Sequence, residues 1–121
     1  MAVTASEQTI VVVEDDARIA DLLDLYLRDA GFRPLLARTG ERALELVRGH
    51  RPVLAVVDVG LPGIDGFEVA RQIKHEYGNA VRIIAVSAYA SENDRRQSLE
   101  AGCELHLVKP ADPRFIESLL G

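Results

Sequence analysis

The feature that most constrains the fold is a regular alternation of short apolar runs with segments of helical spacing. The runs cover residues 9–13, 33–36, 53–57, 82–86 and 105–108. Four of them are rich in valine and isoleucine and lack apolar/polar alternation, which is typical of parallel strands covered on both faces. Pro34 has no backbone N–H to donate, so we expect the second run to form an edge strand.

Between the runs, apolar side chains recur at the spacing of a helical face. The clearest stripe runs from Ile19 to Ala30 and stops at Gly31, a residue type favoured after helix ends. Further helices are predicted at residues 40–48, 66–77, 92–100 and 113–120. Their stop and start signals are Gly49, Gly78, Gly102, Ser91 and Asp112. Strict alternation with short connections predicts an α/β fold of the (βα)5 type, a doubly wound parallel sheet with helices on both faces.

Composition excludes several classes of function. The 121 residues suffice for one domain, which we expect at residues 9–121. Residues 1–8 are expected to form a flexible leader, and they lack the features of a signal peptide. The formal charge of −5 disfavours direct nucleic-acid binding, and no apolar run approaches the length of a membrane span. One cysteine, Cys103, rules out an internal disulfide framework and is consistent with the cytoplasm.

Polar residues follow the strands at the ends where a parallel α/β sheet binds its ligands. They are Glu14, Asp15 and Asp16 after the first strand, Asp58 after the third, Ser87 after the fourth and Lys109 after the fifth. Neighbouring carboxylates repel unless a cation lies between them, and a set of oxygen ligands suits Mg²⁺. Each acidic residue taken singly is explained as a helix or turn cap, but their joint placement favours a metal site.

Such a site has the groups needed to receive a phosphoryl group. Lys109 and Ser87 would surround its oxygens, and Asp58 is the candidate nucleophile because carboxylates form phosphoryl intermediates. Gly60 lacks a side chain, so its carbonyl can approach a metal. The three histidines, His50, His75 and His106, show no metal-ligand spacing, which argues against a zinc site.

These motifs resemble those of response regulator receiver domains of two-component signalling, the chemotaxis-Y-like family. The resemblance spans residues 8–120 and rests on four segments. They are Val12-Val13-Glu14-Asp15-Asp16, Val57-Asp58 with Leu61-Pro62-Gly63 and Asp65-Gly66, Ser87-Ala88, and Ala101-Gly102 leading to Leu107-Val108-Lys109-Pro110. It implies a flavodoxin-like fold with strand order 2-1-3-4-5.

The resemblance implies a signalling switch rather than an enzyme with a separate substrate. Asp58 would take a phosphoryl group from a phosphohistidine on a histidine kinase or phosphotransfer protein, with Mg²⁺ held by Glu14, Asp15, Asp58 and the Gly60 carbonyl. Lys109 would pair with the phosphoryl group, and Ser87 would move toward it. The surface around the fourth helix, fifth strand and fifth helix would then change. In this family, kinase choice is typically set on the first helix, here including Arg18, Asp21, Leu22 and Leu25.

Three positions depart from the family pattern or modify it. His106 stands where the family usually has tyrosine or phenylalanine, so coupling by ring rotation is in doubt, although an imidazole can hydrogen-bond near Ser87. Gly60 offers no side chain to orient hydrolytic water, and Tyr89 could shield the acyl phosphate. We therefore hypothesise slow self-dephosphorylation, with a plain surface role for Tyr89 as the alternative.

Other classes of function remain open from the sequence. A degenerate receiver would act as a phosphorylation-independent binding module, although the complete set of acids, hydroxyl and lysine argues against it. An aspartate-nucleophile phosphatase usually needs a second acid where this chain has Gly60, and a flavin protein needs a phosphate loop where it has Glu14 to Asp16. The sequence does not decide between a stand-alone receiver and part of a hybrid histidine kinase.

Overall fold

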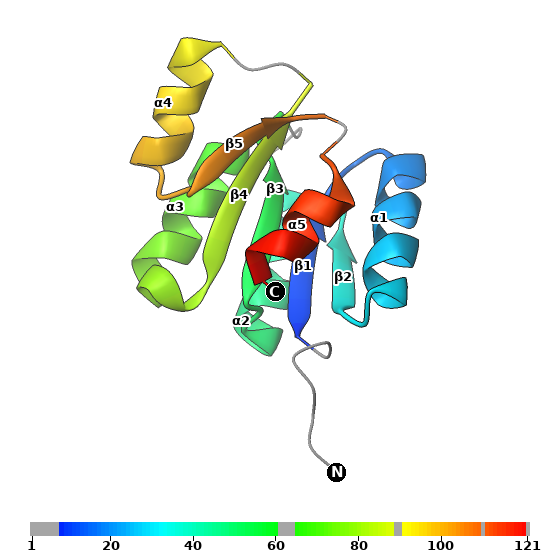
Figure 1. Ribbon diagram of the computed structural model, residues 1–121. Coiled ribbons are helices and arrows are strands. Elements are labelled where there is room, and N and C mark those ends of the chain that lie inside the picture. Colours follow the sequence, from blue (N-terminus) through cyan, green and yellow to red (C-terminus); the bar gives the residue numbers. More distant parts are fainter. Residues whose placement is uncertain (1–7, 61–64, 89–90, 110, 121) are drawn as a thin grey trace.

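The computed structural model describes residues 8–60, 65–88, 91–109 and 111–120, and it shows five parallel strands flanked by helices (Figure 1). The strands are β1 (Thr9–Val13), β2 (Arg33–Ala37), β3 (Leu54–Asp58), β4 (Arg82–Ser87) and β5 (Leu105–Val108). The helices are α1 (Ala17–Asp29), α2 (Gly40–His50), α3 (Gly66–Tyr77), α4 (Glu92–Glu100) and α5 (Pro113–Leu120), with a 3₁₀ turn η2 (Gly78–Ala80). The sheet order β2-β1-β3-β4-β5 confirms the predicted flavodoxin-like fold.

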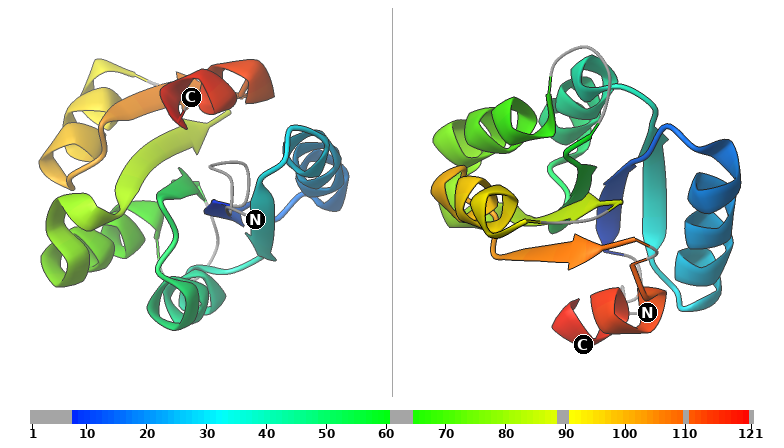
Figure 2. Two further views of the ribbon diagram at one scale, coloured as in Figure 1. Left: turned by 60° about the horizontal axis from the view of Figure 1, so that its bottom comes forward. Right: turned by 90° about the horizontal axis from the view of Figure 1, so that it is seen from above.

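The sheet separates two apolar cores, as the period of two in each strand requires. Val11 and Val13 of β1 pack toward α2 and α3, whereas Ile10 and Val12 pack toward α1 and α5. Helix α4 lies beside α3 and β5 (Figure 2). All five residues of β3 are buried, which matches its central position in the sheet.

The predicted element boundaries hold within a few residues, with one instructive error at the end of α2. The prediction that Gly49 stops this helix is wrong, because the helix continues to His50. Arg51 closes it instead, in a left-handed conformation with φ of 46°, and its N–H donates to the Val47 carbonyl at 2.8 Å. A residue other than glycine adopts the conformation that glycine normally supplies.

Two further expectations concern the N-terminal leader and membrane-spanning helices. The proposed leader lies almost entirely outside the described residues, which begin at Gln8. Within the described part of the chain, no helix combines the length and the apolar character that crossing a membrane requires.

Gly66 is the glycine on which the approach of α3 to the site depends. A Cβ atom there would lie 2.4 Å from the Val59 Cα and 2.6 Å from the Asp58 carbonyl oxygen. We expect Gly66→Ala to lower the free energy of unfolding by about 1–3 kcal/mol, because backbone atoms must shift. The matched control is Gly49→Ala, where nothing lies within 4 Å and the helix should gain about 0.5–1 kcal/mol. Urea unfolding measures both, and equal midpoints for Gly66→Ala and wild type would contradict the prediction.

Candidate functional site

The carboxyl ends of four strands bring the predicted site residues to one edge of the sheet. Glu14 directly follows β1, Asp58 ends β3, Ser87 ends β4 and Lys109 directly follows β5. The strands point toward the same end of the molecule (Figure 1), so residues distant in sequence meet there. Glu14, Asp58 and Ser87 are buried, which is unusual for polar residues without partners.

Lys109 is the centre of the charge arrangement. Its ammonium donates to Asp58 Oδ2 at 2.6 Å and to Glu14 Oε2 at 3.0 Å. The Lys109 side chain is 18% exposed, and those of Glu14 and Asp58 are 5% and 7% exposed. Burial alone lowers the pKa of Lys109, but the hydrogen bonds and negative charges of the two carboxylates outweigh it and raise that pKa above its ordinary value.

Asp58 is held from both sides. Lys109 binds its Oδ2 atom, and the backbone N–H of Gly60 donates to its Oδ1 atom at 2.8 Å. Glu14 Oε2 is shared in a similar way, because it also accepts the Asp16 N–H at 3.1 Å. Each Asp58 oxygen accepts one hydrogen bond and keeps a second lone pair, and Glu14 still has its Oε1 atom, so both carboxylates can bind a cation as well.

Glu14, Asp15 and Asp58 form an acidic cluster that could hold a metal ion. One carboxylate oxygen from each lies within 4.8 Å of the others. Glu14 and Asp58 are buried and Asp15 is exposed, so the cluster opens toward solvent at Asp15. Only oxygen donors contribute, which favours a hard divalent cation over zinc. The predicted participation of the Gly60 carbonyl stays a prediction.

Asp16 has a different task from its two acidic neighbours. Its Oδ1 atom accepts the backbone N–H groups of Arg18 at 2.9 Å and Ile19 at 3.3 Å, so it is the N-cap of α1. These two backbone bonds, with that of Ile19 the stronger cause, lower the pKa of Asp16. The capping interpretation therefore holds for Asp16, one position beyond the predicted metal pair.

Ser87 and His106 lie in contact, as expected from the sequence. Ser98 also contacts His106, and the sequence analysis did not predict this contact. The imidazole Nε2 of His106 lies 2.8 Å from Ser87 Oγ, and its Nδ1 lies 2.6 Å from Ser98 Oγ on α4. Ser98 has no exposed surface and is the sole buried residue of α4, all of which the structure describes. The signal that could have revealed it is the absence of an apolar stripe in residues 92–100.

The remaining predicted residues lie away from these contacts or outside the described part of the chain. Tyr89 is not among the described residues, so its proposed shielding role stays a prediction. His50 and His75 are exposed. Cys103 is buried, and burial raises its pKa to about 11, which keeps the thiol protonated and unreactive.

Comparison with known proteins gives consistent matches. A family model described as "Response regulator receiver domain" matches residues 10–120. The polar-differentiation response regulator DivK of Brucella anthropi is 33% identical over 114 residues, 93% of both chains. The transcriptional regulatory protein AfsQ1 of Streptomyces coelicolor is 39% identical over 110 residues, 91% of this chain but only 48% of AfsQ1. The BeF3-activated N-terminal receiver domain of Klebsiella pneumoniae RstA has a TM-score of 0.83 at 28% identity, covering 93% of this chain and 94% of that chain.

Replacing Lys109 with methionine keeps the alkyl stem but leaves two buried carboxylates without their cation. At pH 7.5 we expect Lys109→Met to lose about 3 kcal/mol of unfolding free energy. The pKa of Lys109 is raised in the folded state. The charged lysine therefore contributes its full stabilisation at pH values below its ordinary pKa of 10.5, and this stabilisation is lost as the pH rises through the folded-state pKa. The difference between variant and wild type should therefore shrink above about pH 10.5 in urea titrations.

Lys74→Met is the matched control for this variant. The Lys74 ammonium bonds to the Asn79 side chain at the surface, and its charge acts on Glu104 rather than on Glu14 or Asp58. We expect this control to change stability by less than about 0.5 kcal/mol. A Lys109→Met protein as stable as the control at pH 7.5 would contradict the central role of the ion pair.

Proposed function

Because the chain belongs to the response regulator receiver domain family, we propose that it is a phosphorylation-dependent signalling switch with Asp58 as the phosphoryl acceptor. The observation that carries the proposal is the Lys109 ammonium 2.6 Å from the buried Asp58 carboxylate, beside the acidic cluster of Glu14, Asp15 and Asp58. A nucleophile, a fixed positive charge and a set of metal ligands thus lie within one small site.

The chemistry proposed is transfer of a phosphoryl group from a phosphohistidine nitrogen to an Asp58 oxygen. The new P–O bond forms as the P–N bond breaks, and the electron pair of that bond stays on the donor imidazole. Mg²⁺ bound by Glu14, Asp15 and Asp58, with the Gly60 carbonyl as a further proposed ligand, would neutralise charge on the transferring group. Lys109 would exchange its bond to the Asp58 carboxylate for one to a phosphoryl oxygen.

Ser87 is proposed to report the new anion to the rest of the fold. Its hydroxyl stands at the end of β4, next to Asp58 in the sheet, because Asp58 is paired with Val86. A hydroxyl can donate to a phosphoryl oxygen. Phosphorylation of Asp58 would add such acceptor oxygens, which the unmodified carboxylate lacks. The surface of α4, β5 and α5 would change in consequence.

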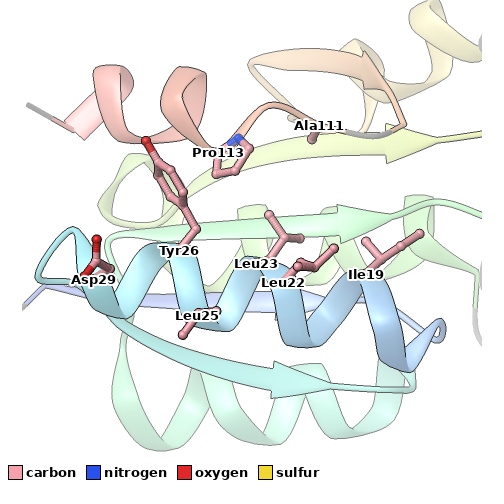
Figure 3. Close-up of a pocket in the computed structure, with 8 residues that line it drawn as sticks. All are labelled: Ile19, Leu22, Leu23, Leu25, Tyr26, Asp29, Ala111 and Pro113. Carbon is pink, nitrogen blue, oxygen red and sulfur yellow. The ribbon is translucent and has the colours of Figure 1, made fainter.

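The partner proposed is a histidine kinase or a histidine phosphotransfer protein in the cytoplasm, and its docking surface is proposed on α1. Leu22 and Leu25 of this helix are each 68% exposed. They border an apolar groove that Ile19, Leu23, Tyr26, Asp29, Ala111 and Pro113 also line (Figure 3). The groove continues to Ala111, two residues after Lys109, so a partner seated there would reach the acceptor.

Phosphorylation by a small donor tests the proposal without knowledge of the kinase. We expect acetyl phosphate with Mg²⁺ to add one phosphoryl group to the wild-type chain and none to Asp58→Asn, as measured by intact mass and ³¹P NMR. Asp15→Asn should require more Mg²⁺ for the same yield, because one ligand of the cluster loses its charge.

Asp21→Asn is the control, since Asp21 is exposed on α1 outside the cluster and its loss should change neither yield nor Mg²⁺ requirement. A folded wild-type chain that acquires no phosphoryl group would refute the proposal. The remaining function would then be a binding module that works without phosphorylation.

The lifetime of the phosphoryl group depends, in this proposal, on the missing side chain at Gly60. A Cβ atom there would lie 3.4 Å from Asp58 Oδ1, so a longer polar side chain would stand beside the acyl phosphate. We expect Gly60→Asn to hydrolyse on the order of tenfold faster than wild type, because an amide can orient the attacking water. The measurement is ³¹P decay after removal of the donor, with Gly49→Asn as a control, and equal lifetimes would refute the role of Gly60.

A further inference from the structure

The contact between α4 and the sheet is polar where the other helix contacts are apolar. Helix α4 buries only Ser98, and its one large apolar residue, Leu99, is 60% exposed. By contrast, α1 buries Leu23 and Leu27, and α3 buries Val69 and Ile73. The hydrogen bond between Ser98 and His106 is therefore a principal attachment of α4, together with the Arg95 side chain, which donates to the His106 carbonyl at 3.4 Å.

His106 joins this attachment to the proposed phosphorylation site. Its two ring nitrogens are both engaged, one with Ser87 and the other with Ser98, at 2.8 and 2.6 Å. His106 is 7% exposed and Ser98 is fully buried, so water is excluded from replacing Ser98 as a partner. Three residues from β4, β5 and α4 thus form one continuous hydrogen-bonded chain.

The imidazole in this chain is neutral near pH 7. Burial is the main cause that lowers the pKa of His106, and the charge of Arg95 acts in the same direction. The Asp94 backbone opposes both causes through a hydrogen bond with the ring, and the Asp94 side-chain charge acts with it, without reversing the net shift. A neutral imidazole donates from one nitrogen and accepts at the other, so each hydrogen bond fixes the direction of the other.

Two tautomers satisfy the geometry, and they differ at Ser87. With the proton on Nδ1, the ring donates to Ser98 and accepts the Ser87 O–H. With the proton on Nε2, the ring donates to Ser87 and accepts the Ser98 O–H, and the Ser87 proton is directed to an acceptor other than the imidazole. An anionic phosphoryl oxygen next to Ser87 needs that proton, so it favours the second tautomer.

We propose that His106 is a positioning residue for the Ser87 hydroxyl, and that the hydrogen-bonded chain Ser87–His106–Ser98 couples phosphorylation of Asp58 to helix α4 through the tautomer of the imidazole. This inference rests on the proposed function, because the phosphoryl group is the anion that the chain detects. Helix α4 receives the signal as a reversal of the Ser98 hydroxyl, which accepts from the ring in one state and donates to it in the other.

The direct test is the tautomer of His106, read from the ¹⁵N shifts of its ring at pH 7.5. We expect the spectrum to move toward the Nε2–H form when Asp58 is phosphorylated with acetyl phosphate and Mg²⁺, or when beryllofluoride is added as a phosphoryl mimic. His50 and His75, which are exposed, serve as internal references and should not change. A His106 tautomer that is the same before and after phosphorylation overturns the proposal.

Variants separate the coupling from a merely structural role. Ser98→Ala removes the far end of the chain and leaves Ser87 and His106 intact, so phosphorylation should persist while amide exchange in α4 stops responding to it. Gln97→Ala, at an exposed neighbouring position, should retain the response. An α4 that responds equally in Ser98→Ala and wild type overturns the proposal.

His106→Phe tests the positioning of Ser87, since it fills the site but removes both hydrogen bonds. We expect phosphorylation from acetyl phosphate to slow about fivefold, the equivalent of one hydrogen bond, with Mg²⁺ affinity unchanged. An unchanged rate overturns the positioning role. If Asp58 accepts neither acetyl phosphate nor beryllofluoride in the wild type, the proposed function fails and this inference fails with it, whereas modified Asp58 with an unmoved imidazole refutes the inference alone.

Discussion

Two buried carboxylates beside a single ammonium are the constraint around which the site end of this molecule is built. Glu14 and Asp58 lie at the carboxyl ends of adjacent strands, β1 and β3, where their charges would repel without a cation. Lys109 directly follows β5, and β4 lies between β5 and β3 in the sheet. Its long side chain must therefore extend across the end of β4, and the order of the strands determines that only a long, flexible cation can fill this role.

This arrangement contributes to function more than to stability. Buried ion pairs recover little beyond the cost of removing their charges from water, and an apolar replacement of all three groups would serve the fold as well. The fold already has two apolar cores, on the two faces of the sheet, that do not depend on the ion pair. The charged residues are concentrated at one edge, where, in the proposed function, Lys109 would exchange its bond to Asp58 for one to a phosphoryl oxygen while the cores stay intact.

The elements that sequence predicted best are those whose apolar pattern is strongest. The valine- and isoleucine-rich runs identified the central strands. The polar residues that follow these runs indicated that Glu14, Asp58 and Lys109 lie close together, as they do in the structure. The end of α2 was mispredicted because Arg51, rather than a glycine, adopts the left-handed conformation. Ser98 was missed because its role arises from a contact between α4 and β5. The absence of an apolar stripe in residues 92–100 indicates that α4 needs a polar attachment, but it does not indicate which residue makes it.

The edge position of β2 has a consequence for association between molecules. The Arg33 N–H donates inward to the Gln8 carbonyl, so by the alternation of a parallel strand the next residue, Pro34, has its nitrogen on the open side of the sheet. That side lacks a donor where an incoming strand would need one. A foreign strand that docks along β2 would leave one of its carbonyls unpaired, which protects the sheet from growing into an aggregate when many copies crowd together.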